Sequence, residues 1–201
     1  MPNWCENRMT IAHSDPTKIN EVIEAAKSGH LFNYFVPMPE ELVNTRAQYI
    51  EESNMTEYQK SLVEKYGAKD WYDWSQINWG TKWDAADNPR ISDIYSHNNK
   101  TCVDIDYETP WTTADEALIA AVKKGFVIEN FYIEEGVGFC GYWQGQLNEY
   151  DDPVYDDTCI EYNNEDISTE EAINEFIQNH VPRIIDEKFS LRERFLNAIE
   201  S

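Results

Sequence analysis

Residues 101–111 read TCVDIDYETPW, a stretch in which apolar and polar side chains alternate. Val103 and Ile105 therefore point to one side of a β-strand, and the acids Asp104 and Asp106 point to the other side. A strand of this kind has one face in a hydrophobic core and one face in water. The stretch predicts an antiparallel sheet that is buried on one side.

The rest of the chain places strands and helices around this stretch in a regular order. Asn98 and Asn99 tolerate left-handed backbone angles, so they predict a hairpin turn just before it. The order strand, helix, strand, strand, helix, strand predicts an α+β fold. More specifically, it predicts a ferredoxin-like split βαββαβ antiparallel sheet with its helices on one face. The expected strands of this order are 7–13, 90–97, 101–111 and 126–135, and its expected helices are 16–29 and 113–125. A further strand is expected at 138–147.

Two segments fall outside this order. Residues from about 40 to 86 are predicted to form a helical insertion rich in tryptophan. Residues 148–201 are predicted to form an acidic segment followed by helices that pack on the first domain, residues 1–147. The domain organisation is thus one ferredoxin-like domain with an insertion and a C-terminal extension.

The charge of the chain is strongly negative and unevenly distributed. The formal net charge is −22, and residues 125–182 hold fourteen acids and no Lys or Arg. Such a field repels nucleic acids and anionic membranes and attracts basic proteins. Neither direct nucleic-acid binding nor a membrane partner is expected. Because no apolar secretion signal is seen at the start, a cytoplasmic protein with four free cysteines is expected.

Residues 148–166, NEYDDPVYDDTCIEYNNED, concentrate this charge, with eight acids and three tyrosines among nineteen residues. No glycine follows the acids as a calcium-binding EF-hand loop requires. The interleaved tyrosines favour an ordered loop or an edge strand over a disordered tail. Two functions stay open, a solubilising face or a surface that imitates the phosphates of duplex DNA. The candidate partner-binding residues are Glu149, Tyr150, Asp151, Asp152, Tyr155, Asp156, Asp157, Glu161, Glu165 and Asp166.

Tryptophans gather in the motif NWGTKWDA at residues 78–85 and recur in ETPW at residues 108–111. The indoles could form a slot for a base, with a lysine beside a phosphate. They could equally fill the seam between the insertion and the sheet. This second interpretation is favoured, and it is extended to Trp4 and Trp143. The candidate ligand pocket consists of Trp79, Lys82, Trp83 and Trp111.

A catalytic alternative rests on Asp104 and Asp106, two carboxylates on one strand face that could bind a divalent ion together with Glu134. A ferredoxin-like sheet supports such chemistry in nucleotidyl-transfer enzymes. One observation argues against this catalytic alternative, because the chain has no phosphate-binding glycine loop. Its histidines and cysteines form no recognisable nucleophile motif or zinc site. No catalytic residue and no cofactor are predicted.

Five motifs occur along the chain in the order MPNWCENRMTI, PMPEEL, NWGTKWDA, ETPW and YIEEGVGFCG. Together they resemble the ferredoxin-like domain family named after the plasmid protein YubB, which is found widely in phage proteins. The resemblance covers residues from about 1 to 147. It implies a ferredoxin-like fold and residence on a mobile element, and it implies no catalytic residue or ligand.

These observations favour a non-catalytic accessory protein of a phage or plasmid, located in the host-cell cytoplasm. It is expected to bind and inhibit a host protein that has a basic groove, such as a defence or nucleic-acid enzyme, through a DNA-mimic-like surface. Two alternatives remain: a metal-dependent phosphoryl-transfer or hydrolytic enzyme, and a nucleotide binder with a tryptophan-lined pocket. A homodimer is also left open.

Overall fold

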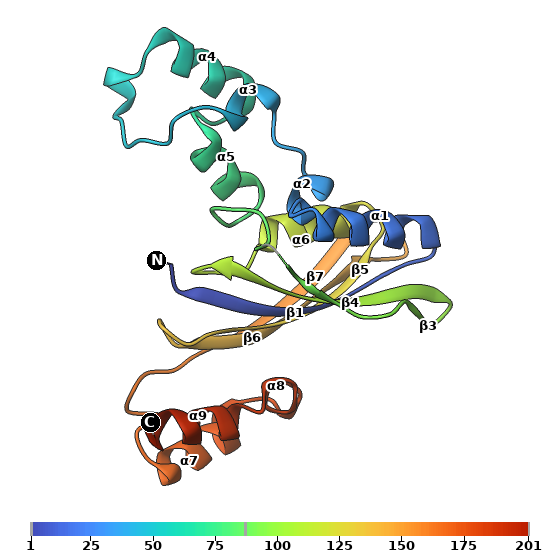
Figure 1. The fold of residues 1–201 in the computed structure, drawn as a ribbon, viewed down its shortest axis with the longest axis vertical. Helices are drawn as coiled ribbons and strands as arrows, with labels where there is room; N and C mark the ends of the chain where they lie inside the picture. The colour runs from blue at the N-terminus through green and yellow to red at the C-terminus, as the bar shows by residue number, and fades with distance from the viewer. Residues whose placement is uncertain (1, 87, 201) are drawn as a thin grey trace.

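In the computed structural model, which describes residues 2–86 and 88–200, seven strands form one antiparallel sheet (Figure 1). The alternating stretch quoted above forms β4 (Lys100–Pro110). Strand β1 (Trp4–His13) pairs with β4 on one side and with β5 (Val127–Glu134) on the other, antiparallel in both cases. The strand order is β2–β4–β1–β5–β6–β7, and β3 pairs with β4. The predicted α+β class is confirmed.

The remaining elements have the following bounds. The strands are β2 (Arg90–Ile91), β3 (Tyr95–His97), β6 (Phe139–Leu147) and β7 (Pro153–Glu161). The helices are α1 (Pro16–Lys27), α2 (Leu31–Phe35), α3 (Glu40–Val43), the short 3-10 helix η1 (Glu52–Asn54), α4 (Glu57–Tyr66), α5 (Trp71–Asn78), α6 (Asp115–Lys123), α7 (Glu170–His180), α8 (Arg183–Phe189) and α9 (Leu191–Glu200).

The alternation in β4 determines which face of the sheet meets the larger core. Val103 and Ile105 are fully buried, whereas Asp104 and Asp106 are half-buried on the opposite face. The core side of the sheet is covered by α1, α2 and α6, which lie in one layer above it (Figure 1). This layer buries the apolar stripes of the helices against the strands, as the sequence predicts.

The predicted hairpin before β4 is confirmed. Asn98 and Asn99 have φ angles of 48° and 61°, in the left-handed region, and connect β3 to β4. The expected strand over residues 90–97 is interrupted, because only Arg90–Ile91 and Tyr95–His97 pair with β4.

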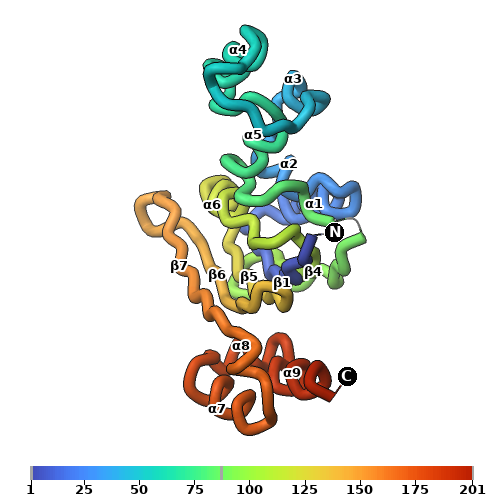
Figure 2. Tube along the Cα trace, turned by 90° about the vertical axis from the view of Figure 1, so that its left-hand side faces the viewer, coloured from blue at the N-terminus to red at the C-terminus, as the bar shows by residue number. Residues whose placement is uncertain are grey.

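The two helices of the predicted order, α1 and α6, lie on one face of the sheet (Figure 1), but further helices cover part of the other face, so the prediction that this face is in water is wrong there. Helices α7, α8 and α9 lie under the face opposite α1 and α6 (Figures 1 and 2). The Arg8 side chain of β1 lies over the ring of Phe189, 4.7 Å from its centroid, and donates a hydrogen bond to the carbonyl of Lys188. Arg194 of α9 pairs with Glu6 of β1 at 2.7 Å.

These contacts explain why the sequence pattern misleads. Charged side chains on the second face suggest contact with water, but here they are matched by charges and carbonyls of the C-terminal helices. A second hydrophobic core lies beneath this end of the sheet. Its buried members are Ile133, Cys140, Tyr162, Ile173, Phe176, Val181, Ile185, Phe189, Leu191 and Phe195.

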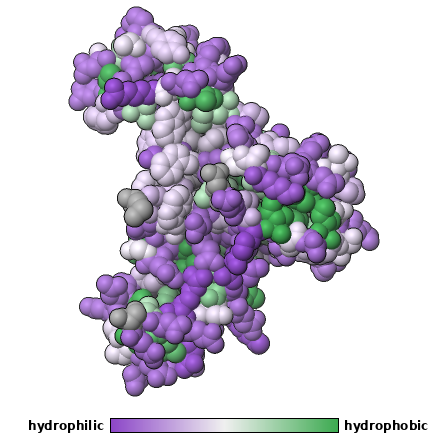
Figure 3. Space-filling model, viewed as in Figure 1, coloured by the Kyte–Doolittle hydropathy of each residue, from purple (hydrophilic) through white to green (hydrophobic). Residues whose placement is uncertain are grey.

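The insertion extends away from the sheet, with α3 and α4 at its far end and α5 leading back toward α2 and α6 (Figure 1). Leu42, Leu62 and Trp74 are buried within it. On the face viewed in Figure 3, the insertion and the C-terminal helices present mostly hydrophilic surface. Among the described residues, no helix has the length and apolar character needed to cross a membrane.

Replacing Phe189 with alanine tests how strongly the C-terminal helices are held on the sheet. Phe189 is only 3% exposed and carries the Arg8 contact, so Phe189→Ala should lower the free energy of unfolding by about 3–5 kcal/mol. Ile184 on the same helix is 50% exposed, and Ile184→Ala should change it by less than about 0.5 kcal/mol. Urea unfolding followed by circular dichroism gives both values, and equal effects of the two variants would contradict this packing.

Glu6 should make the stability of the fold depend on pH in the acid range. Burial by itself raises the pKa of Glu6, but hydrogen bonds from Arg194 and Arg8 outweigh burial and lower the pKa below 4.5. A carboxylate with a lowered pKa stabilises the fold above its unfolded pKa, and this contribution disappears as the pH falls through the folded value. Glu6→Gln should therefore lower the free energy of unfolding by about 1–3 kcal/mol at pH 7.

The gap between wild type and Glu6→Gln should shrink as the pH falls below about 4.5, the ordinary pKa of the group. Urea titrations between pH 3 and pH 7 measure it. Glu57→Gln serves as the control, because the Glu57 side chain is 90% exposed and pairs with Lys60 on its own helix. A gap that stays constant with pH for Glu6→Gln would show that the carboxylate does not act in this way.

Candidate functional site

The acidic stretch of the sequence forms the last strand of the sheet together with the turns that flank it. We call residues 149–166 the acidic edge. Its strand, β7, pairs with β6 and stands at the end of the strand order, and it runs along the outside of the molecule in Figure 2. All ten predicted partner-binding residues lie here; Asp166 is half-buried and the other nine are exposed. The alternative of a disordered tail is thereby removed.

The turn that leads into β7 is built by Asn148. Its side-chain oxygen accepts hydrogen bonds from the backbone N–H groups of Tyr150 at 2.8 Å and Asp152 at 3.0 Å. Asp151 between them has a φ of 61°, a left-handed angle that Asp tolerates better than most residues. This turn holds the acids at its tip toward solvent.

Aromatic contacts anchor the strand on its inner side. Tyr155 stacks on Trp143 of β6, with ring centroids 5.9 Å apart and an interplanar angle of 13°. Past the end of the strand, Tyr162 is 6% exposed and packs against Phe176 and Phe195 of the C-terminal helices. Tyr155 therefore packs on Trp143 of the first core, and Tyr162 packs within the second core.

The carboxylates of β7 do not form one flat array. Because side chains alternate along a strand, Asp157 and Glu161 lie on the face that carries α6, and Asp156 lies on the other face. Asp157 accepts a hydrogen bond of 2.7 Å from the hydroxyl of Tyr132. Burial and this carboxylate raise the pKa of Tyr132 far above its ordinary value, so the hydroxyl stays a donor.

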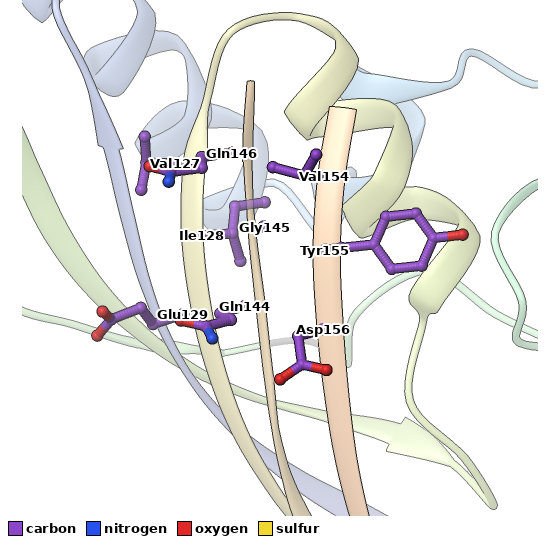
Figure 4. Close-up of a pocket in the computed structure, with 9 residues that line it drawn as sticks. All are labelled: Val127, Ile128, Glu129, Gln144, Gly145, Gln146, Val154, Tyr155 and Asp156. Atoms are coloured by element: carbon purple, nitrogen blue, oxygen red, sulfur yellow. The ribbon is translucent and has the colours of Figure 1, made fainter. Parts of the chain in front are cut away.

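On the side of Asp156 the sheet is hollowed. A depression of about 290 Å³ lies over β5, β6 and β7, and Figure 4 shows the Tyr155 ring pointing away from Gln144 and Glu129. The strand registers place Asp104, Thr10, Glu129, Gln144 and Asp156 in one row across the sheet. With strands ~4.8 Å apart, three carboxylates follow each other at intervals of about 10 Å along this row.

Glu129 is the carboxylate of this row that the sequence analysis did not single out. Its signal is present, because the alternation of FVIENFYIEE puts Glu129 on the face opposite Ile128. The sequence does not say that β7 is added beside β6, so nothing links Glu129 to Asp156 before the sheet is formed.

The three residues of the metal alternative are not brought together. Glu134 is 1% exposed on the core face, where its carboxylate accepts hydrogen bonds from the N–H groups of Gly136 and Val137. Asp104 and Asp106 lie on the opposite face. Within the described parts of the chain, no group of three or more His, Cys, Asp or Glu residues could hold a metal ion.

The two aspartates are instead engaged by neighbouring side chains. Asp104 accepts hydrogen bonds from Thr10 at 2.6 Å and from Tyr95 at 3.0 Å. Burial, followed by the Asp104 carboxylate, raises the pKa of Tyr95 to about 12. Asp106 pairs with Arg90 at 2.9 Å. The pair thus forms part of a hydrogen-bonded polar sheet face.

A second candidate surface is a set of exposed indoles at the base of the insertion. We call Trp4, Trp83 and Trp111 with Lys82 the tryptophan cluster. The ring centroid of Trp83 lies 6.3 Å from that of Trp4 and 6.4 Å from that of Trp111. The Lys82 ammonium lies 4.2 Å from the Trp83 centroid and 5.4 Å from the Trp111 centroid. Each of the three indoles is about 40% exposed.

The structure does not bring all four residues of the predicted tryptophan pocket together. Trp79 is 5% exposed, and its indole N–H donates to the carbonyl of Val36, so this residue belongs to the core and not to the pocket. Trp143 is buried as well. Trp4, Trp83 and Trp111 are exposed, so the favoured interpretation that these indoles fill a buried seam is wrong for all three. Trp111 has a φ of 64°, an unfavourable angle for a large side chain that presents its ring to solvent.

Comparisons with known proteins identify no family for this chain. No family model matches the chain, and no curated protein matches it. A crystal structure of protein api92 from Yersinia pseudotuberculosis, of the DUF1281 family, is 12% identical to this chain. The match covers 81% of this chain and 99% of that one, with a TM-score of 0.42. A similarity of that degree carries no inference about fold or function.

Proposed function

We propose that this chain is a non-catalytic binding protein whose acidic edge docks on a basic groove of a host protein and inhibits it. The observation that carries the proposal is the exposure of nine of the ten predicted partner-binding residues along one edge of the sheet. Residues 125–182 contain no Lys or Arg that could neutralise this surface from within the same segment. A host defence enzyme or a nucleic-acid enzyme has the groove chemistry that fits.

The charge supports fast, salt-sensitive association with a basic partner. A single-sign surface attracts the opposite sign over a Debye length of about 10 Å and raises the association rate. Strand β7 is about 30 Å long and carries three carboxylates, or one per ~10 Å. Duplex DNA carries one charge per ~1.7 Å, so the mimicry we propose is of the sign of the field and not of phosphate spacing.

We further propose that β1, α1, the β3–β4 hairpin, α6 and β5 form a ferredoxin-like unit related to the YubB-named family. The order of these elements and the antiparallel pairing of β1 with both β4 and β5 support this. The motif resemblance over residues from about 1 to 147 supports residence on a phage or plasmid. In this proposal the protein acts in the host-cell cytoplasm, and residues 148–201, with β7 and the C-terminal helices, are an addition that carries the working surface.

Neutralising the acidic edge tests the function. Asp151, Asp152, Asp156 and Asp157 would be replaced by asparagine, which changes the formal net charge from −22 to −18. In affinity purification from host lysate at low salt, wild type should enrich basic nucleic-acid-binding proteins, and the variant should lose them. Duplex DNA should compete with wild type for a purified partner, measured by fluorescence anisotropy, and the variant should compete at least tenfold more weakly.

A matched control removes the same charge elsewhere. Glu51, Glu52, Glu57 and Glu64 of the insertion are exposed, and their replacement by glutamine also gives −18. This control should retain the partner. If both variants lose it equally, only the total charge matters. If neither wild type nor control enriches a basic protein, the proposal fails.

A second candidate function is nucleotide binding at the tryptophan cluster. The specific observation in its favour is that three neighbouring indoles are each about 40% exposed while a lysine lies against them. Stacking of a base on an aromatic ring contributes about 1–3 kcal/mol, and a lysine suits a phosphate. Large aromatic rings with this exposure mark binding surfaces more often than isolated apolar residues do.

Fluorescence titration with nucleoside monophosphates and triphosphates tests this candidate. Saturable quenching is expected for wild type, and Trp83→Leu should weaken binding at least tenfold because a stacking partner is lost. Tyr58→Leu is the control, since Tyr58 is 58% exposed on α4 and does not contact the cluster. Quenching that rises linearly without saturation, or that is the same in Trp83→Leu, would exclude a nucleotide site here.

A further inference from the structure

Strand β7 ends the sheet with an unpaired edge. It pairs with β6 over nine residues and is the last strand in the order, and no described strand lies on its outer side. Figure 2 shows β7 at the outermost edge of the sheet. A long open edge is a template for a further strand, and proteins usually shorten or cover such an edge.

The register shows which backbone groups face outward. Tyr162 donates to the carbonyl of Gly138, and Asn148 donates to that of Asp152, so even-numbered residues of this region bond to β6. In an antiparallel pair the bonding direction alternates from residue to residue. The N–H groups of Tyr155, Asp157, Cys159 and Glu161 therefore point away from β6. Pro153, which has no N–H group, falls in the same odd-numbered set.

The charge of β7 decides what can occupy this edge. Asp156, Asp157 and Glu161 lie on the strand, which holds no Lys or Arg. A second copy of the chain would bring the same three carboxylates to the edge, and like charges on paired strands are destabilising. A basic segment meets each of them with an opposite charge. The edge therefore disfavours self-pairing and favours an extended basic partner.

We propose that a lysine- or arginine-rich segment of a partner protein adds to β7 as an eighth, antiparallel strand. This inference rests on the proposed function and specifies how the acidic edge binds. The partner's cations stand opposite Glu161, Asp157 and Asp156, which in an antiparallel strand gives the spacing K-x-x-x-K-K. The residue that faces Tyr155 meets an aromatic ring already stacked on Trp143, so a guanidinium or a second ring fits there.

The probe is a synthetic peptide, VKTVTKKVTV, which combines strand-forming residues with this spacing. Its control is a peptide of the same composition with the lysines at other positions. Hydrogen exchange of the full chain gives a direct readout. Peptide binding should slow exchange of the amides of Tyr155, Asp157, Cys159 and Glu161 at least tenfold, because they gain hydrogen bonds. The even-numbered amides are bonded to β6 in either state.

Cys159→Pro tests the edge without changing the charge. Proline removes an outward N–H group and blocks pairing, and it is tolerated where the N–H side faces solvent. Affinity for the peptide should fall at least tenfold, while Cys159→Thr should bind like wild type. Retained slow exchange of the even-numbered amides shows that β7 still pairs with β6 in Cys159→Pro. Protection of the outward amides in wild type is measured independently of any variant.

A second set of variants separates this inference from the proposed function. One triple variant combines Asp156→Asn, Asp157→Asn and Glu161→Gln, so the edge stays unpaired but loses its charge. Its affinity for the peptide and the salt dependence of that affinity should both fall. If this variant binds weakly but Cys159→Pro binds normally and the outward amides stay unprotected, strand addition is wrong and acidic docking survives. If the peptide binds neither wild type nor Cys159→Thr, or binds the neutralised variant equally, strand addition is wrong, and the lysate purification described above decides acidic docking separately. Equal affinity of the control peptide would overturn the spacing.

Discussion

Strand β1 is held between two helix layers, and this constraint organises the rest of the molecule. Its residues alternate between the core under α1 and α6 and the opposite face, where the C-terminal helices lie. Ile11 is completely buried in the first core, whereas Glu6 and Arg8 meet the second layer through ion pairs and an aromatic ring. These polar contacts require a specific geometry, because Glu6 must lie within reach of Arg194 and Arg8 must lie over the Phe189 ring. They fix where α8 and α9 sit.

The same alternation shapes the acidic edge. The C-terminal helices cover one end of the second sheet face and leave the other end uncovered. Glu129 and Asp156 line the depression at this uncovered end. Tyr162 carries the chain from β7 into the second core, so the edge strand is tied to the helices that follow it. The acids of β7 therefore stand on a backbone that is already ordered before a partner binds.

The tryptophans illustrate how one residue type can take two roles within a single motif. In NWGTKWDA, Trp79 turns inward and donates its indole N–H to a backbone carbonyl, while Trp83 four residues later is 40% exposed beside Trp4 and Trp111. Gly80, with a φ of 79°, lets the chain turn between them. Trp111 has a left-handed φ of 64°, and its backbone N–H donates to the carbonyl of Asn3. The exposed group is thus a surface of its own, distant in sequence but assembled by the fold.

The sequence by itself determined the α+β class, the strand faces in β4, the Asn98–Asn99 hairpin and the ordered, acidic character of residues 149–166, because each follows from local periodicity, turn chemistry or composition. Only the tertiary structure decided that helices cover both faces, since the partners of Glu6 and Arg8 lie far along the chain. It also decided that Glu134 faces away from Asp104, that Glu129 shares a row with Asp156, and that Trp4 meets Trp83. Strand order and register set these relations, and no local pattern encodes which distant strand lies next to which.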